Sequence, residues 1–93
     1  MLENQIIQAA VLLKSIGHPI RVQIIIALSE KSVMTVTQLS DYLNIDQPVM
    51  SLHLAVLRNQ HVIQVQKEGK KSLYSIEDVS VKQIINIIYH SRK

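Results

Sequence analysis

One short segment carries side chains whose types and spacing suit contact with the edges of DNA bases. Gln47, Ser51, Ala55 and Arg58 recur at steps of three and four residues, so a helix would place them on one face. Gln can hydrogen-bond adenine, Ser can bond several bases, and a small apolar group can contact a thymine methyl. Solvated helix faces usually carry Glu and Lys, and this segment has neither. We therefore interpret this face as a recognition face.

Three lysines gather around a predicted turn a few residues later. Lys67, Lys70 and Lys71 flank Glu68 and Gly69, and lysines in such a turn can reach phosphates or the minor groove. A charged surface turn is common, and a net charge of +3 is by itself only weak support for a polyanionic partner. The lysines become evidence for DNA contact because a predicted helix-turn-helix directly precedes them.

The sequence lacks the signs of other kinds of reactive site. The chain has no cysteine, which removes disulfides, thiol switches and thiolate metal ligands. It shows neither a set of nucleophile, base and orienting group nor a glycine-rich phosphate loop, so we expect no enzyme and no cofactor. Among the histidines, we expect His18 to cap a helix, His53 to pack or bond within its helix, and His61 to be a surface or hinge residue.

Helix signals divide the first third of the chain into two helices. Apolar residues recur at helical spacing through residues 2–16. Gly17 ends that helix, and Pro19 suits the first position of a second helix that runs to about residue 29. This second helix is apolar nearly all round, which is typical of the central helix of a core.

Two short helices with a tight connection follow. Thr35 and Gln38 form the pattern of a capping box, which marks the start of a third helix. Asp46 is expected to cap a fourth helix that runs to about residue 59. Because so few residues separate the two helices, residues 35–59 predict a helix-turn-helix.

A β-hairpin and a last helix complete the chain. Residues 61–67 and 71–76 are rich in β-branched or alternating residues and are separated by a turn. Residues 77–93 predict a helix that starts with acidic side chains and ends with basic ones, as the helix dipole prefers. The order α-α-α-α-β-β-α, with a wing over residues 61–76, predicts a mainly α winged helix-turn-helix fold in a single domain, residues 1–93.

The terminal helices, residues 1–16 and 77–93, carry more apolar side chains than so short a chain can cover. The 93 residues are 47% hydrophobic, mostly Ile, Leu and Val. We expect these helices to pack on a second copy, and a twofold homodimer would place two recognition helices about 34 Å apart, one turn of DNA. A larger intramolecular core is the alternative. The residues expected at the interface are Ile6, Ala10, Leu13, Val81, Ile84, Ile85 and Ile88.

Three stretches of the sequence match a set of family motifs. Residues 13–24 read LKSIGHPIRVQI, residues 47–58 read QPVMSLHLAVLR, and residues 68–74 read EGKKSLY. They are similar, in this order, to L-x-x-L-[AS]-[DH]-P-x-R-x-x-I, Q-S-x-V-S-x-H-L-x-x-L-R and x-G-[RK]-x-x-x-Y. These are motifs of the ArsR/SmtB family of bacterial repressors, which the chain resembles over about residues 10–76.

The resemblance implies a dimer that binds an operator and releases it when an effector arrives. It implies that Gln47, Ser51 and His53 belong to the recognition helix or its DNA face. Two positions depart from the motif, since Pro48 replaces a Ser and Leu52 replaces a basic residue. The residues predicted to bind DNA are Thr37, Gln38, Gln47, Pro48, Ser51, Leu52, His53, Arg58, Lys67, Lys70 and Lys71.

The resemblance also implies where a metal sensor site would lie. Relatives carry C-x-C in the third helix, and this chain has no cysteine there. Others carry D-x-H at the start of the last helix, where this chain has Asp78, Val79 and Ser80, and H-x-x-[EH] near its end, where only His90 remains. A zinc site needs three or four ligands, so we expect no metal site.

These patterns together predict a sequence-specific transcriptional regulator that binds double-stranded operator DNA as a homodimer and acts as a repressor. The alternative is a winged-helix interaction or dimerisation module that does not bind DNA, which the neutral Leu52 and the modest charge would fit. Lys14, His18 and Arg21 interrupt the longest apolar stretch, and Glu3 lies where a signal peptide is basic. We therefore expect a cytoplasmic protein with no membrane partner, and the sequence does not identify an effector.

Overall fold

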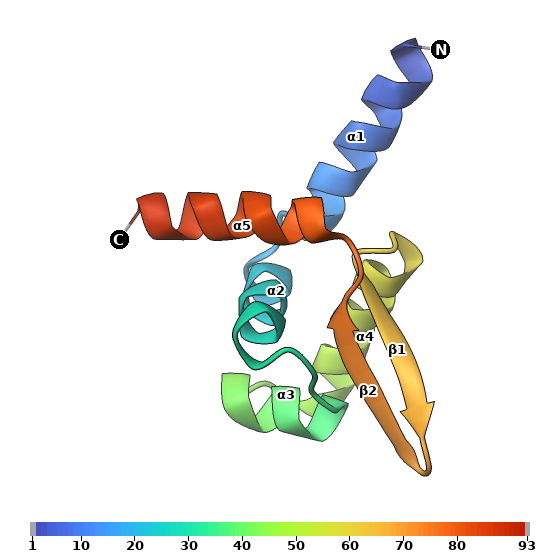
Figure 1. The fold of residues 1–93 in the computed structure, drawn as a ribbon, viewed down its shortest axis with the longest axis vertical. Helices are drawn as coiled ribbons and strands as arrows, with labels where there is room; N and C mark the ends of the chain where they lie inside the picture. Colours follow the sequence, from blue (N-terminus) through green and yellow to red (C-terminus); the bar gives the residue numbers. More distant parts are fainter. Residues whose placement is uncertain (1, 93) are drawn as a thin grey trace.

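The computed structural model describes residues 2–92, which form five helices and one two-stranded hairpin (Figure 1). The predicted order α-α-α-α-β-β-α is confirmed, and the observed bounds lie within about two residues of those expected. The elements are α1 (Leu2–Ile16), α2 (Pro19–Lys31), α3 (Val36–Leu43), α4 (Gln47–Asn59), β1 (Ile63–Glu68), β2 (Lys71–Ile76) and α5 (Val79–Ser91).

The ends of α2 and α3 use the side chains that the sequence predicted. His18 precedes α2, and its Nδ1 accepts a hydrogen bond from the backbone N–H of Ile20 at 3.1 Å. Thr35 and Gln38 make the reciprocal bonds of a capping box at the start of α3, at 3.1 and 2.9 Å. Asn44 ends α3 in the left-handed conformation, at φ 56° and ψ 51°. These contacts satisfy backbone groups that a helix end otherwise leaves unpaired.

The start of α4 differs from the prediction. Asp46 lies at the N-cap position, but its side chain makes no capping hydrogen bond, so that expectation is wrong. A capping side chain bonds the backbone N–H of the second or third helical residue. The second residue of α4 is Pro48, which has no N–H, so one of the two possible donors is missing.

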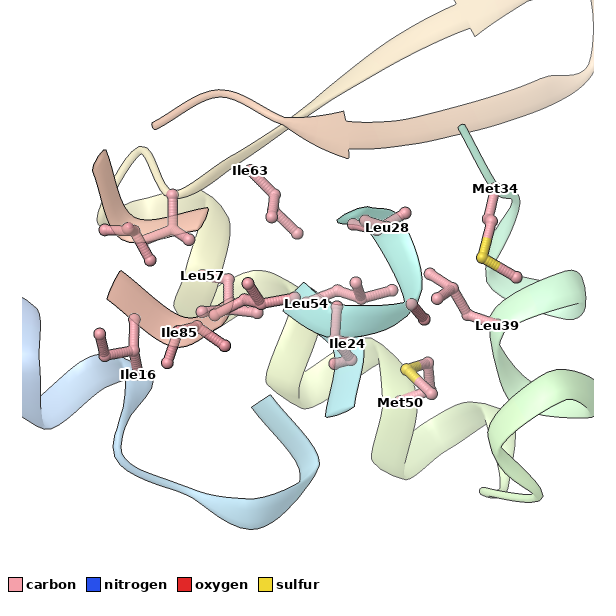
Figure 2. Close-up of a cluster of buried hydrophobic side chains, with 14 residues drawn as sticks. Ile16, Ile24, Leu28, Met34, Leu39, Met50, Leu54, Leu57, Ile63 and Ile85 are labelled. Carbon is pink, nitrogen blue, oxygen red and sulfur yellow. The ribbon is translucent and has the colours of Figure 1, made fainter. Parts of the chain in front are cut away.

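The core is built around α2, as its apolar sequence predicted. Ile24, Ile25 and Leu28 of α2 are at most 1% exposed, and α2 packs against α3, α4, α5 and β2. Burying one such side chain contributes about 1.5–3 kcal/mol, so these contacts hold the helices together. Figure 2 shows the cluster; its labelled members are Ile16, Ile24, Leu28, Met34, Leu39, Met50, Leu54, Leu57, Ile63 and Ile85.

The wing is an antiparallel hairpin that is tied to the connection between α2 and α3. Its register pairs Ile63 with Ile76 at one end and Glu68 with Lys71 at the other. Met34 and Tyr74 exchange two backbone hydrogen bonds, at 3.0 and 2.8 Å, which anchor β2 beside the start of α3. The predicted first strand began two residues too early, because the chain turns at His61, where φ is 58°.

α1 projects from the rest of the protein, and α5 crosses α2 on the same side of the molecule (Figure 1). Residues 2–11 are all exposed, and only Ser15 and Ile16 of α1 are buried. Among residues 2–92, no single helix is long and apolar enough to cross a membrane. α1 and α2 reach the required length and composition only as a pair, which is bent by 86°.

Candidate nucleic-acid interface

α4 presents one polar face to solvent and buries the other. Met50, Leu54 and Leu57 are at most 1% exposed and attach the helix to the core. The predicted recognition face points outward, and every one of its members is exposed: Gln47, Ser51, Ala55 and Arg58. The helical spacing of these residues produces this division, because both sets repeat at three and four residues. Pro48 and Leu52 are exposed as well, and Leu52 is 70% exposed.

A surface hydrogen bond joins α3 to the start of α4. The Gln47 side-chain Nε2 donates to Thr37 Oγ1 at 3.1 Å, so two of the predicted DNA-binding residues are neighbours. Gln38 is exposed too, but its Oε1 accepts the Thr35 N–H in the capping box. The bond restricts the rotamer of Gln47 and leaves its amide oxygen available to a ligand.

The wing brings its lysines close to the start of α3. Lys67, Lys70 and Lys71 are all exposed, and the turn between the strands contains Gly69 at φ 62°, a conformation that glycine adopts without strain. Lys70, Lys71 and Ser72 line a shallow pocket with Thr35, Val36 and Thr37. The positive end of the α3 dipole and two lysine residues thus border one pocket, an arrangement that favours an anion such as a phosphate.

His53 lies apart from the outward face of α4. It is half-buried, and its Nδ1 accepts a hydrogen bond from Arg21 Nε at 3.1 Å. Its ring centroid is 4.4 Å from that of His18. His53 was expected to pack or bond within its helix; it packs against His18, and its hydrogen-bond partner, Arg21, lies on α2 rather than on α4. Sequence patterns could not show this contact, because 32 residues separate the two side chains.

The sequence has clear relatives among transcriptional regulators. It matches the family described as "Bacterial regulatory protein, arsR family" over residues 18–65. The chain belongs to the ArsR family. It is 36% identical over 81 residues to the HTH-type transcriptional regulator MJ1325 of Methanocaldococcus jannaschii, covering 87% of this chain and 91% of that one. It is 33% identical over 79 residues to the transcriptional repressor PagR of Bacillus anthracis, covering 85% and 79%.

Solved structures share the fold of this ArsR-family protein. Reduced HlyU from Vibrio cholerae superposes with a TM-score of 0.85 at 30% identity, covering 96% of this chain and 93% of HlyU. PagR gives the same TM-score at 30% identity, covering 92% and 98%. The winged helix-turn-helix fold and the family predicted from the three sequence motifs are therefore confirmed.

The terminal helices of this ArsR-family protein divide their apolar residues between the core and the surface. Val81 and Ile85 are 1% and 6% exposed, because α5 packs on α2 through them. They were predicted to contact a second copy; both contribute to the protomer's own core, and Ile85 also lines the apolar pocket between α1 and α5. The other five residues of that prediction are exposed: Ile6, Ala10, Leu13, Ile84 and Ile88. An apolar pocket between α1 and α5 is lined in part by Leu13, Ile84 and Ile88.

The candidate metal-ligand positions of the family serve other roles in this structure. Asp78 is the N-cap of α5 and accepts hydrogen bonds from the Ser80 hydroxyl and from the backbone N–H groups of Ser80 and Val81. These bonds, that of the Ser80 hydroxyl first, lower the pKa of Asp78. His90 lies in the last turn of α5, in edge contact with Tyr89. In residues 2–92, no three His, Cys, Asp or Glu side chains are grouped so as to hold an ion.

Proposed function

We propose that this ArsR-family protein is a sequence-specific DNA-binding regulator of transcription in the cytoplasm, and that it acts as a repressor. One observation carries the proposal: the exposed face of α4 has no acidic side chain, and the wing directly after it exposes three lysines. The names of PagR and of the biofilm growth-associated repressor of Xylella fastidiosa, which is 28% identical over 88 residues, support a repressor. HlyU of Vibrio cholerae is named an activator, so the sign of regulation needs its own measurement.

In this proposal α4 enters the major groove and the wing contacts the DNA backbone. Gln47 and Ser51 face base edges, and the hydrogen bond that Gln47 donates to Thr37 restrains the Gln47 side chain before DNA binds. The wing lysines, with the start of α3, contact phosphates on either side of the groove. Phosphate contacts supply affinity for any sequence, and base contacts supply the preference for an operator.

We also propose that the protein acts as a homodimer formed by α1 and α5. Both helices expose large apolar side chains, among them Ile6 at 59%, Ile84 at 43% and Ile88 at 52%. Leu13 of α1 and Ile84 and Ile88 of α5 line the apolar pocket between the helices, so a second copy seated there would contact both helices. Such a dimer has twofold symmetry, which fits an operator with two half-sites one DNA turn, about 34 Å, apart.

Footprinting on DNA upstream of the protein's own gene tests the proposal. Protection of a site with two half-sites, and a reporter silenced when that site overlaps a promoter, is the expected result. Protection of the site together with an activated reporter would show that the protein is an activator and not a repressor. If the protein binds neither this DNA nor random duplexes, the DNA-binding proposal is wrong.

Variants of the wing and of α4 should lose DNA binding in different ways. Lys70→Ala and Lys71→Ala remove phosphate contacts, so we expect weaker binding to every duplex and a shallower salt dependence. Ser51→Ala or Gln47→Ala should cost about 1–3 kcal/mol on the operator alone and relax preference at particular base pairs. Fluorescence anisotropy over a salt series measures both. Lys31→Ala, which removes an exposed lysine at the end of α2, is the control for charge. Equal losses on operator and random DNA for all four variants would contradict the assignment of α4 to the groove.

A further inference from the structure

Arg21 connects α1, α2 and the proposed recognition helix through one guanidinium. Its Nη1 donates to the backbone carbonyl of Ser15 near the end of α1, at 2.9 Å. Its Nε donates to His53 Nδ1 on α4, at 3.1 Å. Arg21 and His53 are both half-buried, so water competes less for these bonds than at an open surface. A guanidinium holds its donors in a rigid plane, so the two bonds together link the end of α1 to α4 in a restricted geometry.

The bond to His53 depends on the protonation of the imidazole. A guanidinium can only donate, so His53 must present an unprotonated Nδ1. When the imidazole is charged, both ring nitrogens carry protons, and Nδ1 then faces a donor instead of accepting from it. The second histidine of the cluster has the same requirement, because His18 Nδ1 accepts from the backbone N–H of Ile20.

The surroundings of His53 favour the neutral ring. Burial and the charges of His18 and Arg21, in that order, lower the pKa of His53. His18 precedes α2 and Arg21 lies within it, and these are the titratable and charged groups whose fields act on His53. Because the folded pKa lies below the ordinary value of about 6.5, the bond is present above that pH and is lost as the pH falls through the lowered value.

We propose that Arg21 is a positioning residue for DNA binding, which braces α4 against the end of α1 and does so only while His53 is neutral. The proposal rests on the DNA-binding function proposed above. The core contacts of Met50, Leu54 and Leu57 attach α4 to the body without Arg21, so the guanidinium is not needed for the helix to pack. The two hydrogen bonds of Arg21 instead set the orientation of α4 relative to the end of α1. Since α1 carries part of the proposed dimer face, the same residue connects the geometry of the dimer to the recognition helix.

Operator binding measured from pH 8 to pH 5.5 tests this role. Anisotropy is recorded on the footprinted operator and on a random duplex, and the ratio of the two affinities removes the general gain in positive charge at acid pH. The wild-type ratio should fall below about pH 6.5. Arg21→Ala should lower operator affinity about tenfold at pH 8, leave random-duplex affinity unchanged, and show no acid step. Arg21→Lys keeps the positive charge but lacks the planar pair of donors, so it should recover only part of the operator affinity.

Two histidine variants separate this brace from other titrations. His53→Asn keeps an acceptor in place of Nδ1 that does not take up a proton, so its affinity ratio should stay level down to pH 5.5. His61→Asn removes an exposed histidine. The backbone of residue 61 is left-handed, a conformation that Asn tolerates, so this variant should fold and should still lose operator preference at acid pH. A level profile for His61→Asn with an unchanged acid step in His53→Asn would overturn the proposal. So would Arg21→Ala with wild-type affinity and pH profile.

Nuclear magnetic resonance of the free protein gives a readout that does not depend on DNA. His53 should carry its proton on Nε2 at pH 8 and should titrate below about pH 6.5. Its pKa should rise in Arg21→Ala, because the charge that lowers it is gone. A His53 that titrates identically in both proteins would show that no brace exists. If these shifts appear but no duplex is bound, the brace stands as a structural contact, and the DNA-binding function and the positioning role both fail.

Discussion

Leu52 is the residue at which this protein departs most visibly from its family motif. It is 70% exposed on α4, where the motif carries a basic residue. Leu52→Arg should tighten binding to operator and random DNA alike and raise the salt dependence by about one released counterion. Anisotropy over a salt series measures both effects. Gln23→Arg, which adds the same charge at an exposed position of α2, should change neither. A loss of operator binding in Leu52→Arg would mean that the leucine itself contacts bases.

At the scale of single residues, spacing predicted orientation but not partners. The outward position of Ser51 and Arg58 followed from helical geometry, because their angle around α4 depends only on their separation along the chain. The bonds of Gln47 to Thr37 and of Arg21 to His53 join side chains 10 and 32 residues apart. Such contacts depend on how whole helices pack, and a local pattern contains no information about that.

At the scale of elements, two aspartates at helix starts provide a matched pair. Asp78 caps α5 through its side chain, whereas Asp46 makes no capping bond to α4. Asp78→Ala should cost about 1 kcal/mol of unfolding free energy at pH 7, and Asp46→Ala less than about 0.5. The pKa of Asp78 is lowered in the fold, so the difference should be full above about pH 4 and should shrink as the pH falls through the lowered value. Urea unfolding at pH 7 and pH 3 measures this.

Asp78→Asn keeps a capping oxygen and should lose less stability than Asp78→Ala at pH 7. Equal costs for Asp46→Ala and Asp78→Ala would show that the side-chain bonds at the start of α5 do not stabilise it.

Caps were the most predictable features of these elements, because Thr35 and Gln38 act within four residues of each other. The failure at Asp46 also has a local cause, since Pro48 supplies no N–H. The faces of α5 were harder to predict: apolar residues surround that helix, so the sequence did not show that Val81 and Ile85 face inward.

At the scale of the whole molecule, most of the large apolar side chains that are exposed in residues 2–92 lie on α1 and α5. Ile84→Asp with Ile88→Asp places two charges in the proposed interface, where burial is costly, so the double variant should be monomeric. It should also lose operator binding, because a single recognition helix reads only one half-site. Sedimentation at tens of micromolar measures the mass, and Val33→Asp, an exposed position outside both helices, is the control. A wild-type monomer at that concentration would contradict the dimer.

The projection of α1 from the body links the folding of each chain to the number of chains present. Isolated helices shorter than about 12–15 residues are marginal in water, and residues 2–11 have no buried contact within the protomer. In the proposed dimer a second copy stabilises this segment by mass action, so dilution unwinds α1 as well as separating the protomers. Unwinding that starts at the N-terminus of α1 would reach Ser15 only near the end of the helix, and the carbonyl of Ser15 accepts the hydrogen bond from Arg21. Under the proposed function, the abundance of the protein in a cell should therefore set both how many operators are occupied and how much of each chain is folded.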